Sequence, residues 1–362
     1  MNGLFGIISS ESDPQDLKNS MDRMSSVICA RPTDGSDVFV GDGAAMFVAD
    51  STHRGGRSSF YEDPDATVAF WGYLWNRDEV RSSASRGGEA DGLSPSEIIV
   101  SLWRRFGAEA IDRLNGRFAA AIWHKNKKEM ILLNDRFGFC PMYYWTTRDR
   151  CLFGSQYKAI RADSRFRGEV DVSALGDFLS LGYSTGDRTL FKQVRLLPPA
   201  SVATLRPGEG PSIRRYWDYS FHSDADPVQT EAQYEEGFFS LLGKALKRQA
   251  ATARRVLVPV SGGYDSRILS GMLSRVKERD GVVALSYGHD HALDVVYGKK
   301  IARKCGLKHY TVPIESDYLS RFAERFVWML EGTVNCLNAH MLTTFDVIER
   351  EDIDSVMTGF FG

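Results

Sequence analysis

The sequence predicts two domains of different class: an α+β domain built mainly from short strands, then an α/β domain with a parallel sheet. Three observations support this expectation. The chain has 362 residues, and domains usually hold about 100–200 residues. Short β-rich runs dominate residues 1–205, whereas strands and helices alternate in residues 231–362. Residues 206–230 contain a Gly–Pro cluster and a polar stretch, so a linker is expected between the two domains.

The first 205 residues are expected to form stacked sheets covered by helices. Apolar and aromatic runs bounded by Gly, Asp or Pro predict strands at 4–8, 44–49, 66–71, 117–124, 129–134 and 152–154. The polar residues 125–128 join two of these strands, which indicates a hairpin. Apolar residues at helical spacing predict helices at 16–28 and 96–106, the second with Ser94 or Ser96 as its N-cap.

In the second domain, the periodicity changes to an alternation of helices and strands. Helices are predicted at 231–253, 266–277 and 292–305, and strands at 256–260, 282–286 and 309–313. This order implies a parallel sheet with right-handed crossovers. The first helix is amphipathic, because one side carries Tyr234, Phe238, Leu241, Leu242 and Leu246.

Composition excludes several classes of protein. The chain has 45 basic and 47 acidic residues, a net charge of −2, so it has no general attraction for nucleic acid or acidic membranes. No apolar run reaches the roughly 18 residues of a membrane span, and no secretory signal is visible. The five cysteines are far apart and form no CxxC pair. They predict neither a disulfide framework nor a zinc cluster, and they fit a cytoplasmic protein.

The strongest chemical motif follows the apolar strand at 256–260. Ser261-Gly262-Gly263-Tyr264-Asp265-Ser266 combines two conformationally permissive glycines with the start of a helix. Backbone N–H groups and the helix dipole there favour an anion, and two serine hydroxyls add donors. Asp265 would repel bare phosphate, so its expected partner is Mg²⁺ on a polyphosphate. A plain strand-to-helix turn remains the alternative, and the ending of the Walker loop is missing.

This segment resembles the pyrophosphate-binding loop of the N-type ATP pyrophosphatases, and further motifs extend the resemblance to the asparagine synthetase family over nearly the whole chain. The matching segments are Met1-Asn2-Gly3-Leu4-Phe5-Gly6-Ile7, Leu114-Asn115-Gly116-Arg117-Phe118-Ala119, Asn134-Asp135-Arg136-Phe137-Gly138 with Pro141-Met142-Tyr143-Tyr144, Thr189-Leu190-Phe191-Lys192, Leu197-Pro198-Pro199-Ala200, Asp294, and Gly306-Leu307-Lys308-His309-Tyr310. The resemblance implies an N-terminal nucleophile-type domain of the glutamine amidotransferase class, followed by an ATP pyrophosphatase domain.

The resemblance also implies ATP and Mg²⁺ as cofactors, with Asp265 as the metal ligand. The positions that it assigns to ATP are Val258, Val260, Ser261, Gly262, Gly263, Tyr264, Asp265, Ser266, Ser286, Tyr287, Gly288, Thr358 and Gly359. Thr358 to Gly362 aligns with the family's Ser-Gly-x-Gly-x motif, whose next residue is a second Mg²⁺-binding aspartate. That aspartate would be residue 363, so the second domain is expected to be truncated at its C-terminal end. Many members have a glutamate where this chain has Phe360, a residue that cannot accept a proton.

Departures from the family pattern predict that glutaminase activity is lost. Glutamine-using members have a cysteine nucleophile at position 2, where this chain has Asn2. Their Asn-Gly-Glu glutamine clamp is replaced by Trp71, Gly72 and Tyr73, which leaves the polar groups of glutamine unpaired. Arg54 matches an arginine that would hold a carboxylate, although a solvated arginine is the simpler interpretation.

By resemblance, the function is ATP-dependent, AMP-forming ligation, in which an amine or ammonia attacks an adenylated carboxylate. Arg267 stands where asparagine synthetases usually have Ser, and this form is closer to the cysteine-less branch similar to β-lactam and lasso-peptide macrolactam synthetases. Two alternatives stay open: an ordinary glutamine-hydrolysing asparagine synthase, and a non-catalytic nucleotide-binding scaffold. The expected partners are a small-molecule or peptide carboxylate and either a second copy or a biosynthetic protein, without nucleic acid or membrane.

Overall fold

The computed structural model describes residues 3–11, 13–28, 36–41, 43–49, 58–84, 92–221 and 230–359. The chain divides into two compact units. Unit 1 comprises Met1–Ser220 together with Glu331–Asn335, and unit 2 comprises Phe221–Leu330 with Cys336–Gly362. Unit 1 thus includes residues 206–220 of the span predicted as a linker. It also includes the five residues Glu331–Asn335, which come from the second half of the sequence.

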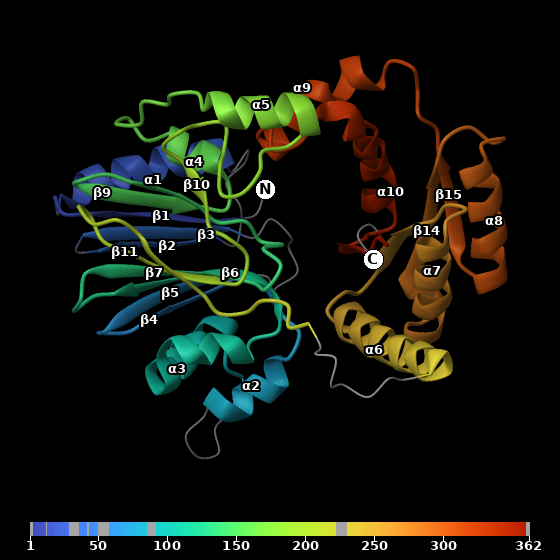
Figure 1. The fold of residues 1–362 in the computed structure, drawn as a ribbon, viewed down its shortest axis with the longest axis horizontal. Coiled ribbons are helices and arrows are strands. Elements are labelled where there is room, and N and C mark those ends of the chain that lie inside the picture. The colour runs from blue at the N-terminus through green and yellow to red at the C-terminus, as the bar shows by residue number, and fades with distance from the viewer. Residues whose placement is uncertain are drawn as a thin grey trace. The chain divides into compact units, whose positions relative to one another are not determined.

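Unit 1 contains two antiparallel six-stranded sheets, stacked with helices on their outer faces (Figure 1). The first sheet has the order β10(Arg195–Leu196), β8(Tyr143–Thr146), β9(Arg150–Gly154), β1(Gly3–Ser9), β3(Ala44–Ala49), β2(Ser36–Gly41). The second has the order β12(Ser212–Arg215), β11(Ser201–Leu205), β7(Glu129–Asn134), β6(Gly116–His124), β5(Ala66–Leu74), β4(Ser58–Glu62). This confirms the α+β sandwich, including the hairpin between β6 and β7.

Two longer helices of unit 1 cover the sandwich, because each buries one apolar face. Helix α1(Pro14–Ile28) buries Leu17, Met21, Met24 and Ile28 against the first sheet, as the helical spacing predicts. Helix α3(Pro95–Phe106) packs on the second sheet and begins with a capping box between Ser94 and Glu97. The remaining helices are α2(Arg77–Ala84), η1(Gly107–Arg113), α4(Tyr157–Arg161) and α5(Val172–Leu181).

The span expected as a linker, 206–230, contains the short strand β12. Its backbone pairs with β11, so that Ser201 lies opposite Arg215 and Thr204 opposite Ser212. All four of its residues are exposed, so no buried apolar pattern marks them. This is why the turn residues that precede β12 dominate the sequence-based interpretation.

Unit 2 is built on a parallel sheet, as the alternation predicts. Its order is β15(Lys308–Val312), β14(Val282–Tyr287), β13(Val256–Pro259), β16(Ser355–Val356). The other elements are α6(Glu231–Ala251), α7(Tyr264–Val276), η2(Arg279–Gly281), α8(Leu293–Cys305), α9(Tyr318–Leu330), η3(Cys336–Thr344) and α10(Phe345–Arg350). Side chains of α6, α7 and α8 share one core with the sheet, and α10 packs with its opposite face.

Helix α6 departs from the sequence-based picture of one continuous buried face. Tyr234, Phe238 and Leu241 are 60%, 55% and 68% exposed, and only the part from Leu242 onward packs against the core of the sheet. The helix therefore contributes to the core through its C-terminal half. Within the described ranges, no helix combines the length and apolar content that a membrane span requires.

Candidate functional site

The predicted anion loop lies between β13 and α7, at the carboxyl end of β13. In a parallel sheet the carboxyl ends of all strands meet at one edge, which is where open α/β sheets bind ligands. A cavity of about 470 Å³ lies at this edge. Its lining comprises Pro259, Val260, Ser261, Gly263, Asp265, Ser266, Tyr287, Asp294, Asn338, His340, Met341, Thr358 and Gly359.

Most of the residues assigned to ATP meet at this cavity, although they come from three separate segments of the chain. The tail residues Thr358 and Gly359 reach it because β16 runs parallel to β13. Five of the assigned residues are not in its described lining: Val258, Gly262, Tyr264, Ser286 and Gly288. Val258 is buried inside β13, and the exposed ring of Tyr264 lies under the guanidinium of Arg267 at 5.3 Å.

Ser286 holds the start of the loop from within the sheet. It is 1% exposed, and its hydroxyl donates to the carbonyl of Val260 at 2.6 Å. The ring Nε2 of His309 lies 2.9 Å from the same hydroxyl. Since the single hydroxyl proton goes to Val260, His309 must be the donor. Burial and, to a smaller extent, the charge of Lys299 lower the pKa of His309, which favours its neutral ring.

The two loop serines organise the turn itself. The Ser266 hydroxyl accepts from the N–H of Ser261 at 3.1 Å, and the Ser261 hydroxyl accepts from the N–H of Gly263 at 3.2 Å. Across the described part of the chain, no side chain caps the amino end of α7. Its first-turn N–H groups therefore remain free of a side-chain partner at the edge of the cavity.

The acidic residues of the cavity fit a Mg²⁺ ion whose remaining ligands are water and the phosphates of a bound substrate. Asp265 and Asp294 both line the cavity. The described residues contain no group of three or more His, Cys, Asp or Glu that could enclose a metal. Mg²⁺ commonly uses one or two carboxylates and completes its octahedron with water and substrate phosphates. Asp265 therefore suits the metal role implied by the sequence, whereas the carboxylate of Asp294 accepts from the Gly262 N–H.

Sequence reasoning missed the wall of the cavity that η3 provides. Asn338, His340 and Met341 belong to this wall. The ring of His340 meets Tyr287 edge-on, with centroids 5.3 Å apart and planes at 90°. A 3₁₀ segment has neither helical nor strand periodicity, so only the Asn and His within an otherwise apolar run could have drawn attention to it.

The residues that replace the family's glutamine-binding Asn-Gly-Glu motif lie on a strand of unit 1. Trp71, Gly72 and Tyr73 lie on β5 opposite β6, and Trp71 packs against the core between the sheets. Gly72 has a φ of 125°, and a Cβ on it would lie 2.1 Å from the Arg117 carbonyl oxygen. A glycine is thus required by the close approach of the two strands. Asn2 and Arg54 lie outside the described residues.

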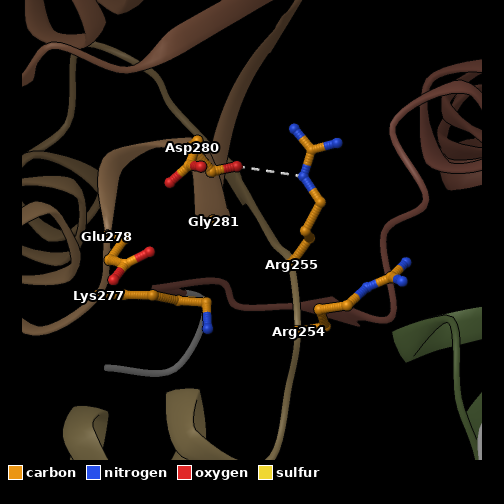
Figure 2. A pocket seen from close by; sticks show the side chains of 6 residues that line it. All are labelled: Arg254, Arg255, Lys277, Glu278, Asp280 and Gly281. Carbon is orange, nitrogen blue, oxygen red and sulfur yellow. Dashed lines mark hydrogen bonds between the residues drawn. The ribbon is translucent and has the colours of Figure 1, made fainter.

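A second cavity of unit 2 lies at the opposite, amino-terminal edge of the sheet (Figure 2). It measures about 510 Å³ and is lined by Arg254, Arg255, Lys277, Glu278, Asp280 and Gly281. Its cations already have partners within the protein. Arg255 donates to the Asp280 carbonyl and to Glu351. Lys277 donates to the Ala253 carbonyl just after α6, and Arg254 pairs with Asp352. These groups hold the sheet edge together, so the carboxyl-edge cavity is the better candidate site.

Two known protein families match successive parts of the chain. Residues 1–217 match the glutamine amidotransferase domain family, and residues 237–360 match the asparagine synthase family. Asparagine synthetase (glutamine-hydrolyzing) 3 of Bacillus subtilis is 27% identical over 81% of this chain and 48% of its own length. Asparagine synthetase (glutamine-hydrolyzing) 1 of the same organism is 25% identical over 91% of this chain and 52% of its own length. Amidase chyE of Penicillium rubens is 23% identical over 87% of this chain and 49% of its own length.

The chain spans about half the length of the curated relatives it matches. Within this chain, the match to the glutamine amidotransferase domain family precedes the match to the asparagine synthase family. The two antiparallel sheets fall within the first matched range and the parallel sheet within the second. The chain therefore belongs to the asparagine synthetase family, with a glutamine amidotransferase-type domain followed by an asparagine synthase domain.

Proposed function

We propose that this protein is an ATP-dependent, AMP-forming amidoligase that activates a carboxylate as its adenylate. The observation that carries the proposal is the carboxyl-edge cavity. It brings the loop residues Ser261, Gly263 and Asp265 together with Tyr287 and the tail residue Thr358. An uncapped helix start, hydroxyl groups and a carboxylate are the combination that a magnesium-bound polyphosphate needs.

The proposed reaction has two steps. A carboxylate oxygen attacks the α-phosphorus of ATP, the bond from that phosphorus to the bridging oxygen breaks, and pyrophosphate leaves. The nitrogen of an amine or of ammonia then attacks the acyl carbon and loses a proton, and AMP leaves as the amide forms. When bound, Mg²⁺ would neutralise phosphate charge. The amino end of α7 and the hydroxyls of Ser261 and Ser266 would orient the phosphates, and Asp265 would hold the metal.

Unit 1 is proposed to act without glutaminase chemistry. Asn2 lacks the nucleophilic sulfur that the glutamine-using members carry at this position. Trp71 is partly buried and packs against the core between the sheets. We therefore propose a structural role for this unit, either as a scaffold for the synthetase domain or as a docking surface for a second copy or a biosynthetic partner.

The substrate is proposed to be a small-molecule or peptide carboxylate. Relatives named asparagine synthetase favour aspartate with ammonia or glutamine as the nitrogen source, and this is the second candidate. Another similar protein is named an amidase, so similarity to this chain is not confined to proteins named asparagine synthetase. Arg267 in place of the usual serine favours the branch in which an amine of the substrate attacks.

ATP–pyrophosphate exchange in the full-length protein tests this proposal against a panel of carboxylates that includes aspartate. We expect exchange with at least one carboxylate and its loss in Asp265→Ala, while the exposed Asp290→Asn change leaves it intact. Absence of exchange with every carboxylate, despite ATP binding, favours a nucleotide-binding scaffold. Glutamate release from glutamine would contradict the interpretation of Asn2 and favour the ordinary asparagine synthase.

A further inference from the structure

A carboxylate of the protein itself occupies one backbone N–H group of the loop in the candidate site. Three backbone N–H groups of the loop have acceptors within the protein. Those of Ser261 and Gly263 go to serine hydroxyls, whereas that of Gly262 goes to the carboxylate Oδ1 of Asp294 at 3.2 Å. Asp294 lies in the first turn of α8, so a charged group from another element occupies a donor suited to phosphate.

The peptide that follows this N–H is fixed at its other side as well. The guanidinium of Arg267 donates to the carbonyl of Gly262 at 2.6 Å. A Cβ on Gly262 would lie 3.3 Å from the ring of Tyr297, which also belongs to α8. Gly262 is therefore held between α7 and α8, with a positive group on its carbonyl and a negative group on its N–H. The Gly262 N–H can donate fully to a ligand only after its hydrogen bond to Asp294 breaks.

The charges around the cavity determine which ligand can take that place. The described lining of the cavity contains the carboxylates of Asp265 and Asp294 and includes no Arg or Lys. A metal-free polyphosphate would meet these two negative charges, while the guanidinium of Arg267 beside the loop is engaged by the Gly262 carbonyl. At short range one such charge changes binding by about tenfold or more. A polyphosphate with Mg²⁺ brings the compensating charge with it.

We propose that Asp294 is a specificity-determining residue that makes polyphosphate binding depend on Mg²⁺. Its carboxylate occupies the Gly262 N–H in the free protein and repels phosphate that arrives without a metal. The inference rests on the proposed ATP site and adds a function for a residue of α8. It differs from a purely structural role, because loss of a structural contact would weaken binding with and without metal alike.

Isothermal titration of the full-length protein with ATP, once in Mg²⁺ and once in EDTA, tests the inference. The parent protein should bind at least about tenfold more tightly in Mg²⁺. In Asp294→Ala, binding in EDTA should tighten about tenfold, while binding in Mg²⁺ stays within about threefold. Asp294→Asn removes the charge and keeps an oxygen for the Gly262 N–H, so it should reproduce the effect if charge is the cause.

Asp290→Asn is the matched control, because it removes the same charge from the loop before α8. Asp290 pairs with Lys299 at 2.6 Å and is not part of the described cavity lining. The ratio of ATP affinity in Mg²⁺ to ATP affinity in EDTA should therefore be the same for this variant as for the parent. If this affinity ratio is unchanged in both Asp294 variants, or if they bind ATP more weakly in EDTA, the inference is overturned while the proposed function stands. Absence of ATP binding to the parent protein in either buffer overturns the proposed function and the inference with it.

Discussion

Gly359 lies directly against Asp265 at the carboxyl edge of the parallel sheet. A Cβ on Gly359 would come within 2.7 Å of the Cβ of Asp265 and 3.3 Å of its carbonyl carbon. Both residues line the same cavity, although 94 positions separate them in the sequence. The absence of a side chain at Gly359 thus allows the segment after β16 to pass beside the proposed metal ligand.

The first prediction is that Gly359→Ala weakens ATP binding in Mg²⁺ by about tenfold or more. The added methyl group must displace Asp265 or the tail, and small-to-large changes in packed sites typically destabilise by about 1–3 kcal/mol. Isothermal titration measures the affinity, and urea denaturation measures the free energy of unfolding. Gly271→Ala on α7 is the control, because a Cβ there meets no atom within 4 Å. Equal ATP affinity in the two variants would contradict the prediction.

The second prediction concerns Asp135, which is fully buried in unit 1. Its carboxylate accepts four backbone N–H groups, those of Phe118, Phe137, Phe139 and Cys140, at 3.0–3.2 Å. Burial raises the pKa of Asp135, against the lowering effect of these bonds. In Asp135→Asn, the amide N–H₂ would face backbone donors. We expect a loss of about 1–3 kcal/mol in the free energy of unfolding.

Urea denaturation at neutral pH measures this loss as a lower midpoint with an unchanged m-value. Glu109→Gln in η1 is the control, because this side chain is exposed and surface substitutions usually change stability by less than about 0.5 kcal/mol. A midpoint for Asp135→Asn equal to that of the control would show that the turn holds its shape without the carboxylate.

Much of this fold could be predicted from the sequence, because the strands carry continuous apolar runs between clear turn residues. β3 and β7 lie at the expected residues, and β1, β6, β13 and β14 differ by one or two positions. These strands are buried, so hydrophobicity alone marks them. The exposed β12 and the 3₁₀ wall η3 carry no such pattern, and they take their conformation from strand pairing and tertiary packing.

The candidate site shows the same division. The loop residues Ser261 and Asp265 and the tail residue Thr358 were assigned by motif, and the structure brings them to one cavity. Ser286 was assigned with them, but its side chain turns into the sheet, toward Val260 and His309. A motif fixes the position of a residue along the strand, whereas the direction of its hydroxyl depends on which partners the neighbouring elements bring.

The third prediction is a pH dependence of stability that comes from Glu351. Its carboxylate accepts from Lys308 at 2.7 Å, Tyr310 at 2.5 Å and Arg255 at 3.0 Å. The hydrogen bonds from Lys308 and Tyr310 lower the pKa of Glu351 from 4.5 to about 2. A lowered pKa in the folded state stabilises the protein above the unfolded pKa. This stabilisation disappears as the pH falls from about 4.5 toward 2.

Glu351→Gln should therefore unfold more easily than the parent at pH 7, by about 1–3 kcal/mol for lost bonds to charged groups. The difference should shrink as the pH falls below about 4.5, because the parent loses the same charge. Urea denaturation at pH 7, 4 and 3 measures the difference. The exposed Glu349→Gln in α10 serves as the control. A gap between parent and Glu351→Gln that is as large at pH 3 as at pH 7 would count against the assignment.

The fourth prediction concerns the packing of α8 on the sheet. A Cβ on Gly298 would lie 2.1 Å from the Ser286 hydroxyl and 2.9 Å from the Val260 carbonyl oxygen. Gly298→Ala must therefore break the hydrogen bond between these two groups or push α8 outward. We expect a loss of about 1–3 kcal/mol in the free energy of unfolding. Gly237→Ala, in the open middle of α6, should instead stabilise by about 0.5–1 kcal/mol.

A double-mutant cycle identifies the atom responsible. Ser286→Ala removes the hydroxyl that the new methyl group would strike and leaves a Cβ at 3.3 Å, which is close but tolerable. The loss from Gly298→Ala should thus be smaller by about 0.5–2 kcal/mol in the Ser286→Ala background than in the parent. Strict additivity of the two changes would mean that α8 shifts as a whole. Ser286 would then not be the contact that sets the distance between α8 and the loop of the candidate site.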